Sequence, residues 1–137
     1  MAVIKELIRK GANGTLSFGN FELDAKQKKS DFKFEGDLYK VKTFKEITRL
    51  EKNEMFVYES VPGTVVTDFK VTDQETSFVV EGLTDTSITL ELEPEAEYEV
   101  FVDDTSFGKM KADLGGKINL SLEIDADSTS KIRVAKL

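Results

Sequence analysis

Glutamate occupies every second position from residue 91 to residue 99, and the residues between are mostly apolar. Side chains on a β-strand point alternately to opposite faces, so this register predicts a strand with one acidic face and one mostly apolar face. The acidic positions are Glu91, Glu93, Glu95, Glu97 and Glu99, and Asp103 and Asp104 follow. No Lys or Arg falls inside this segment. Partners for the carboxylates must therefore come from elsewhere in the fold, from solvent cations or from another molecule.

Alternation of this kind recurs throughout the C-terminal half. The residues expected to face inward form seven sets: Phe69 and Val71; Phe78 and Val80; Ile88, Leu90 and Leu92; Tyr98, Val100 and Val102; Met110, Ala112 and Leu114; Ile118, Leu120, Leu122 and Ile124; Ile132 and Val134. Antiparallel strands with one buried face produce this pattern, whereas parallel strands read as continuous apolar runs. Seven such strands predict an antiparallel β-sandwich.

The N-terminal half begins with a strong turn signal, Asn13-Gly14. A type I′ turn needs positive φ at both central residues, which this pair tolerates, so Ile4–Arg9 and Thr15–Leu23 are expected to form a hairpin. An alternative remains open. Val3, Ile4, Leu7 and Ile8 also fit one face of a helix, with Gly11 as its C-cap.

Further strands are expected at Asp31–Glu35, Leu38–Lys45 and Met55–Glu59, separated by turns at Gly36-Asp37 and near Lys52-Asn53. Within this stretch a short helix could begin at Thr43. Thr43 and Glu46 have the spacing of a capping box, and Phe44, Ile47 and Leu50 follow at helical spacing.

Charge divides the chain at Val61-Pro62-Gly63, a turn-forming sequence. Residues 1–60 carry 12 basic and 10 acidic side chains, whereas residues 61–137 carry 7 basic and 16 acidic ones. We interpret 1–60 as a β-hairpin-rich half and 61–137 as a β-sandwich half of one compact unit, because a 60-residue β domain is marginal alone. The fold class expected is all-β.

Composition removes several function classes. The 137 residues include no Cys and no His, which excludes disulfides, thiol catalysis, Cys-based zinc sites and imidazole-dependent triads. A net charge of −7 argues against nucleic acid as a partner, because phosphate binding depends on basic side chains. The sequence has no signal peptide and no apolar run long enough to span a bilayer, so we expect a cytoplasmic protein with no membrane partner.

The segment from Leu92 through Pro94 to Tyr98 gives a more specific indication of the type of β-sandwich. It resembles the corner between the fifth and sixth strands of fibronectin type III domains, which belong with the immunoglobulin-like sandwiches. The resemblance implies that the Tyr98 hydroxyl bonds to nearby backbone and fixes the crossing between the sheets. The chain departs from that fold after the corner, because two further strands are expected at Lys117–Ile124 and Lys131–Lys136.

Two groups of aspartates are secondary candidates for a cation site. Residues 125–130 begin like a calcium loop, with oxygen-bearing side chains at the first, third and fifth places, but lack the Gly and Glu of that motif. A polar hairpin loop is the favoured interpretation. Asp103 and Asp104 beside Asp113 form a second group. The five aspartates considered are Asp103, Asp104, Asp113, Asp125 and Asp127. No cofactor is expected.

The stretches Phe56–Thr64, Gly108–Lys111 and Gly116–Ser121 are similar to those of short, uncharacterised bacterial proteins that are often called endosialidase-like. Sialidases are much larger propellers that carry Trp-containing Asp boxes and hold the substrate carboxylate with three arginines. This chain has no Trp, and its three arginines are Arg9, Arg49 and Arg133, with no spacing that brings them together. No catalytic residue carries over, and the resemblance implies a non-catalytic module.

Three functional hypotheses follow. The first is a non-enzymatic protein-interaction or self-assembly module, in which the basic cluster of Lys26, Lys28 and Lys29 docks on the glutamate face of a neighbouring copy, as in a homo-oligomer. The second is a carbohydrate-binding or carbohydrate-processing accessory protein, for which Phe107 is the aromatic residue expected to be exposed. The third is a calcium-dependent β module. A glycosidase-like carboxylate pair is formally possible, but surface charge is the usual fate of Asp and Glu.

Overall fold

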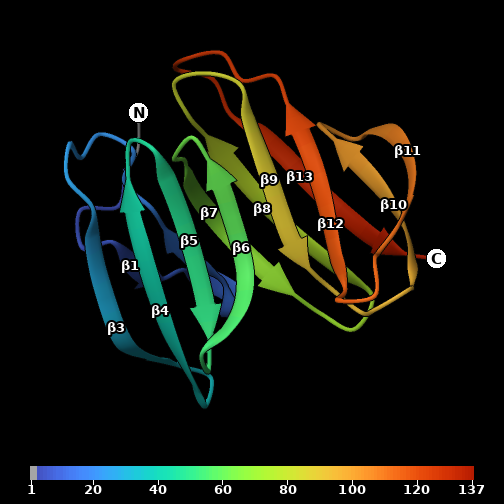
Figure 1. The fold of residues 1–137 in the computed structure, drawn as a ribbon, viewed down its shortest axis with the longest axis horizontal. Coiled ribbons are helices and arrows are strands. Elements are labelled where there is room, and N and C mark those ends of the chain that lie inside the picture. The colour runs from blue at the N-terminus through green and yellow to red at the C-terminus, as the bar shows by residue number, and fades with distance from the viewer. Residues whose placement is uncertain (1–2) are drawn as a thin grey trace.

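The molecule is a sandwich of two antiparallel β-sheets (Figure 1). This computed structural model describes residues 3–137. The seven-stranded sheet contains, in order across the sheet, β1 (Ile8–Lys10), β2 (Leu16–Phe18), β7 (Val65–Val71), β8 (Glu75–Glu81), β13 (Ser130–Lys136), β10 (Glu97–Val102) and β11 (Thr105–Lys111). The six-stranded sheet contains β12 (Lys117–Leu122), β9 (Thr86–Glu91), β6 (Met55–Val61), β5 (Ile47–Lys52), β4 (Asp37–Phe44) and β3 (Gln27–Phe34).

The C-terminal half contains the seven strands that alternation predicts, β7 to β13, and the all-β sandwich class is confirmed. Most residues expected to face inward are buried. Two expectations are wrong: Val71 is 58% exposed and Leu114 is 82% exposed. Val71 is the last residue of β7, and Leu114 lies in the turn after β11, so neither faces the interior of the sandwich.

The N-terminal hairpin forms, but its strands are much shorter than predicted. β1 pairs antiparallel with β2, and Asn13 and Gly14 both have positive φ. They belong to a short 3-10 turn, η1 (Ala12–Gly14), within a longer loop. The Gly11 N–H donates to the Thr15 carbonyl and closes this loop. The helix alternative is wrong, because Leu7 has a φ of 73° and a strand begins at Ile8.

Three of the remaining strands of this half were predicted, although β3 begins four residues earlier than expected, and β5 was not predicted. β3, β4, β5 and β6 form a meander in the six-stranded sheet. The helix expected from Thr43 does not form, because Thr43 lies inside β4 and residues 47–52 form β5. Both central residues of the turns before β4 and β6 have positive φ, at Glu35-Gly36 and Asn53-Glu54. These turns match the right-handed twist of the strands that they connect.

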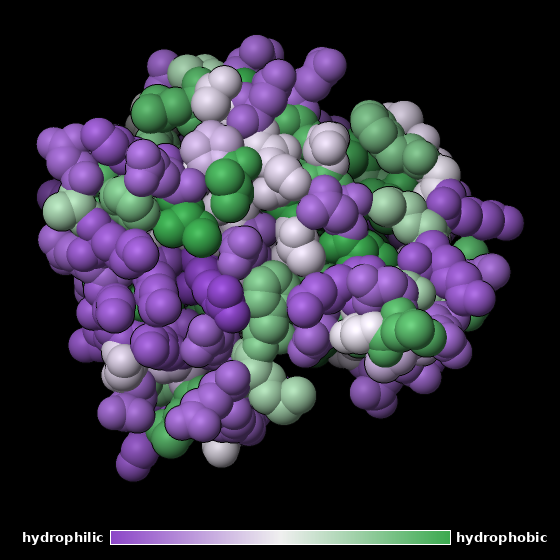
Figure 2. Space-filling view, in the orientation of Figure 1, coloured by the Kyte–Doolittle hydropathy of each residue, from purple (hydrophilic) through white to green (hydrophobic). Residues whose placement is uncertain are grey.

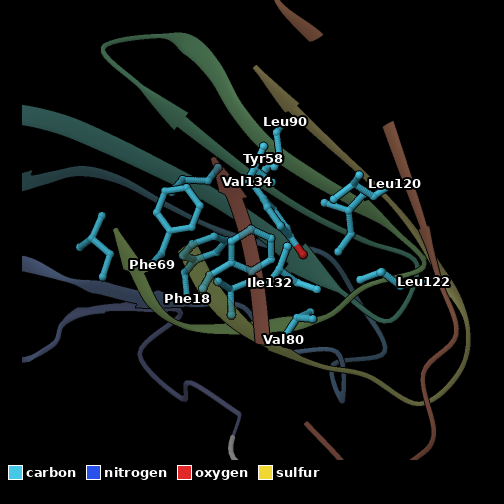
Figure 3. Close-up of a cluster of buried hydrophobic side chains, with 14 of the residues drawn as sticks. Phe18, Tyr58, Phe69, Val80, Leu90, Leu120, Leu122, Ile132 and Val134 are labelled. Carbon is cyan, nitrogen blue, oxygen red and sulfur yellow. The ribbon is translucent and has the colours of Figure 1, made fainter. Parts of the chain in front are cut away.

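Residues from both halves of the chain build one core between the sheets. Phe18, Tyr58 and Phe69 meet edge to face, with ring centroids 5.3 to 6.4 Å apart, and Figure 3 shows them beside Ile132 and Val134. The junction at Val61-Pro62 lies between β6 and β7, which belong to different sheets. Strands from both sides of this junction therefore contribute to each sheet.

A buried hydroxyl network fixes the chain where it crosses from β6 to β7. The Thr64 hydroxyl lies 2.8 Å from both the Tyr58 and the Ser60 hydroxyls, and the Thr48 hydroxyl donates to the Thr64 carbonyl. The Thr48 hydroxyl also lies 2.9 Å from that of Thr43. All five side chains are fully buried, and burial raises the pKa of Tyr58 to about 12. Buried polar groups that satisfy one another in this way hold a single arrangement of the crossing.

Candidate interaction surfaces

The alternating glutamates do not share one strand, so the prediction of a single acidic face is wrong. Glu91 ends β9 in the six-stranded sheet, while Glu97 and Glu99 lie in β10 of the seven-stranded sheet. Glu93 and Glu95 lie in the connection between them. Pro94 and the positive φ of Glu95, 62°, interrupt the strand. The chain thus carries its glutamates from one sheet to the other.

Basic side chains from other strands accompany most of these glutamates. Glu93 forms an ion pair with Lys136, and the pKa of Lys136 is raised by the hydrogen bond and the charge of that carboxylate. The other cross-strand neighbours are Lys117 opposite Glu91, Lys111 opposite Glu97 and Lys109 opposite Glu99. Of the three sources considered for partners, the fold itself supplies an ion pair to Glu93 and places lysines opposite Glu91, Glu97 and Glu99.

Tyr98 fixes this crossing in the manner of a tyrosine corner. Its side chain is 5% exposed, and its hydroxyl accepts a hydrogen bond of 3.0 Å from the Glu93 N–H. The bond holds the start of the connection against β10. The role that the resemblance gave to Tyr98 is therefore present.

The basic cluster has a different environment. In the register of the β3–β4 hairpin, Lys28 lies opposite Lys42, and Lys33 lies opposite Leu38. Lys28 and Lys42 share the outer face of the sheet, because their neighbours Val41 and Thr43 are fully buried. The same alternation places five lysines on this face, which we call the lysine face: Lys26, Lys28, Lys33, Lys40 and Lys42. Figure 2 shows that this side of the molecule, over β3 and β4, is mostly hydrophilic.

No described carboxylate forms an ion pair with any of the five lysines, although Lys26 lies over the ring of Phe44, 5.8 Å from its centroid. Lys42 has cations on both sides, because Lys28 and Arg49 lie directly opposite it on the neighbouring strands. Like charges in directly opposite positions destabilise a sheet. The Arg49 guanidinium is compensated by Glu51 and Glu59, with N–O distances of 3.1 and 3.3 Å. Lys40 lies opposite Glu51, whereas Lys28 and Lys42 lie opposite cations. Around Lys28 and Lys42 the lysine face therefore presents positive charge without an ion-pair partner among the described residues.

Sequence reasoning found only part of this surface. Lys26 and Lys28 belong to it, whereas Lys29 lies opposite buried Val41 and so faces the other way at the sheet edge. Lys33, Lys40 and Lys42 were missed. Their alternation in the strand sequence was visible, but only the register places them beside β3.

A β-bulge shapes the adjoining surface. Pairing of β3 and β4 shifts between Lys29 and Phe32, where Asp31 has a φ of 58°. A depression of about 450 Å³ lies there, with Ser30, Asp31, Lys40 and Glu51 among its lining residues. The bulge also disrupts the hydrogen-bonding edge of β3, a device that limits unspecific strand pairing.

Carboxylates gather at the far end of the sandwich, on three connections that hydrogen bonds hold together. Asp85 accepts the Ile124 N–H, and Asp103 accepts the Lys131 N–H. We call the six carboxylates of these connections the acidic end: Asp85, Asp103, Asp104, Glu123, Asp125 and Asp127. Asp104 forms an ion pair with Lys131, while the side chains of Glu123, Asp125 and Asp127 form none with the described residues.

The aspartates considered for a cation site do not converge. Asp103 and Asp104 lie before β11 and Asp113 lies beyond its other end, so the length of a strand separates them. Asp113 instead accepts the Gly115 and Lys117 N–H groups, and these backbone bonds lower its pKa. Across residues 3–137 no group of three or more acidic side chains is arranged to hold a metal ion.

Phe107 is 69% exposed, as the carbohydrate hypothesis requires. It borders a small depression of about 170 Å³ between the edge strands β11 and β12, together with Met110, Leu120 and Leu122. The three arginines are not assembled into one site, because each has its own carboxylate: Arg9 pairs with Glu6, Arg49 with Glu51 and Glu59, and Arg133 with Glu75.

Comparisons with protein-family models, with curated proteins and with solved structures find no match to this chain. None of the helices in the described part of the chain is long and apolar enough to cross a membrane.

Proposed function

We propose that this protein is a non-catalytic interaction module that assembles with further copies of itself through complementary charge. The observation that carries this proposal is the lysine face, where Lys28 and Lys42 lie directly opposite each other without a carboxylate partner. Such a pair reduces the stability of the isolated molecule. An outside anion that binds there relieves the repulsion, so the arrangement favours a partner.

The contrast with other cations of the molecule supports an interaction role. Arg49, Lys52, Arg133 and Lys136 each form an ion pair with a carboxylate of the same chain. The five lysines of the lysine face lack such partners and share one surface. Because the net charge of the chain is −7, another copy of the chain is an anionic partner for that surface.

Sedimentation velocity tests the proposal at low and high salt over a range of protein concentrations. Assembly through exposed complementary charges should appear at low ionic strength and weaken as added salt screens the charges. A protein that sediments as a monomer under all of these conditions, at high concentration, would contradict self-assembly.

A carbohydrate-binding role is the second candidate, because Phe107 offers an exposed ring beside an apolar depression. Sugar rings stack on such aromatic faces. A glycan array compares the wild type with Phe107→Ala. Signals that vanish in the variant would support this role, and an array without signals would remove it.

A further inference from the structure

We infer that the lysine face binds the acidic end of a second copy, so that the copies associate head to tail. The inference rests on the proposed function and names the partner surface and the polarity of the assembly. Two different surfaces are engaged on each molecule, one basic and one acidic. Contacts of this heterologous kind build rings or open filaments rather than only closed two-fold dimers.

The two surfaces cannot neutralise each other within one molecule. The lysine face lies on β3 and β4, and β3 is one edge strand of the six-stranded sheet. Glu123 follows β12, which is the opposite edge strand of the same sheet. Five strand spacings separate these edges, roughly 24 Å at about 4.8 Å each. This separation exceeds the screening length of about 8 Å at physiological salt, so the attraction acts only between molecules.

The acidic end is a better partner for the lysines than the glutamates of residues 91–99. Of the latter, Glu93 is held by Lys136, and three others lie opposite lysines of their own sheets. Glu123, Asp125 and Asp127 are exposed and form no ion pair with the described residues. Binding of a second copy therefore joins the uncompensated cations of one molecule to the uncompensated carboxylates of the next.

Two double variants separate the surfaces. Lys28→Glu/Lys42→Glu reverses two of the five charges of the lysine face and preserves a like-charge pair between the strands, so the change in fold stability is small. Glu123→Lys/Asp125→Lys reverses part of the acidic end and spares Asp85 and Asp103, which hold backbone N–H groups. Lys5→Glu/Lys10→Glu is the matched control for the first of these variants, with the same change in net charge at exposed positions.

Sedimentation at low salt gives the readout. Each surface variant alone should lose association by about tenfold or more relative to the wild type, while the control retains it. An equimolar mixture of the two surface variants should recover association. One contact joins the intact acidic end of the first variant to the intact lysine face of the second, and the other contact joins the two altered surfaces, whose exchanged charges also attract.

The other outcomes are distinct. Salt-sensitive assembly that survives in either surface variant would overturn the head-to-tail inference and leave the proposed function intact. A wild type that is monomeric throughout would overturn both. If that monomer binds polyglutamate and Lys28→Glu/Lys42→Glu does not, the lysine face serves an acidic partner other than a second copy.

Discussion

Two stretches of like charge distinguish this sequence, the glutamates of residues 91–99 and the lysines around β3, and folding treats them in opposite ways. The glutamates are distributed over two sheets and a connection, where Lys136 and the cross-strand lysines accompany them. The lysines are gathered onto one face, and lysines from β4 join them. One glutamate of the first stretch thus forms an ion pair and three lie opposite lysines, while Lys28 and Lys42 of the second lie opposite each other.

This difference shows that a charge run in a sequence does not by itself mark an interaction surface. What decides is the partner that the strand register places opposite each charged residue. Glu97 and Lys42 are both charged residues of β-strands, yet Glu97 lies opposite Lys111, and Lys42 lies opposite Lys28 and Arg49.

The largest effect on this comparison should come from Tyr98→Phe, which removes the bond that fixes the crossing of the glutamate segment. The Glu93 N–H then loses its acceptor in a part-buried position, so we expect a loss of about 1–3 kcal/mol in the free energy of unfolding. Urea denaturation measures it. Tyr39→Phe is the control, because the structure records no hydrogen bond to the Tyr39 hydroxyl and its ring packs on Phe34. Equal losses in both variants would contradict a role for the Tyr98 hydroxyl.

Much of the fold was visible in the sequence, because strand alternation and turn chemistry are local signals. The seven C-terminal strands follow directly from the alternation of apolar residues. Errors arose where a pattern ran past the end of its element, as at Val71 and Leu114. The helix expected at Thr43 failed because burial and the hydroxyl bond to Thr48 outweighed a capping-box spacing.

The candidate surfaces were less predictable, because they depend on which strands become neighbours. Pro94 was a local signal that the glutamate run does not form one strand, since a proline lacks the N–H that a ladder requires. No local signal places Lys42 beside Lys28, because that requires the register of the β3–β4 hairpin. The buried hydroxyls of Tyr58, Ser60 and Thr64 likewise meet only after β6 and β7 are assigned to different sheets.

Two single charge reversals, one in each charged region, should change the stability of the monomer by smaller amounts. Lys42→Glu places a carboxylate opposite Lys28 and Arg49, so it should stabilise the monomer by about 0.2–1 kcal/mol. Lys111→Glu places a carboxylate opposite Glu97 and should destabilise it by a similar amount. Urea denaturation at low and high salt checks both, and added salt should reduce each difference.

The decisive feature of this pair of variants is the opposite sign of their effects. If Lys42→Glu also destabilises the monomer, the positive charge of Lys42 is already balanced by an interaction other than those of its cross-strand neighbours. In that case the main support for the interaction role is removed.

The smallest effect concerns the ion pair of Glu93 and Lys136, and it should depend on pH. The folded state raises the pKa of Lys136 above its ordinary value of 10.5 because the Glu93 carboxylate bonds to the ammonium group. A raised pKa means that the pair contributes its full stability below pH 10.5, and that this contribution disappears as the pH rises through the pKa of the folded state. Glu93→Gln should therefore have a lower free energy of unfolding than the wild type near neutral pH, and this difference should become smaller in strong alkali. Above pH 10 both proteins also lose stability, because Tyr58 stays protonated in the folded state and ionises in the unfolded state. This shared loss of stability cancels when the two proteins are compared at the same pH. Lys28→Gln provides the contrast, because no carboxylate among residues 3–137 forms an ion pair with Lys28. A deficit of Glu93→Gln that persists unchanged across the alkaline range would show that the glutamate segment is not held by its lysine, and the two charged regions would then no longer differ in the way described.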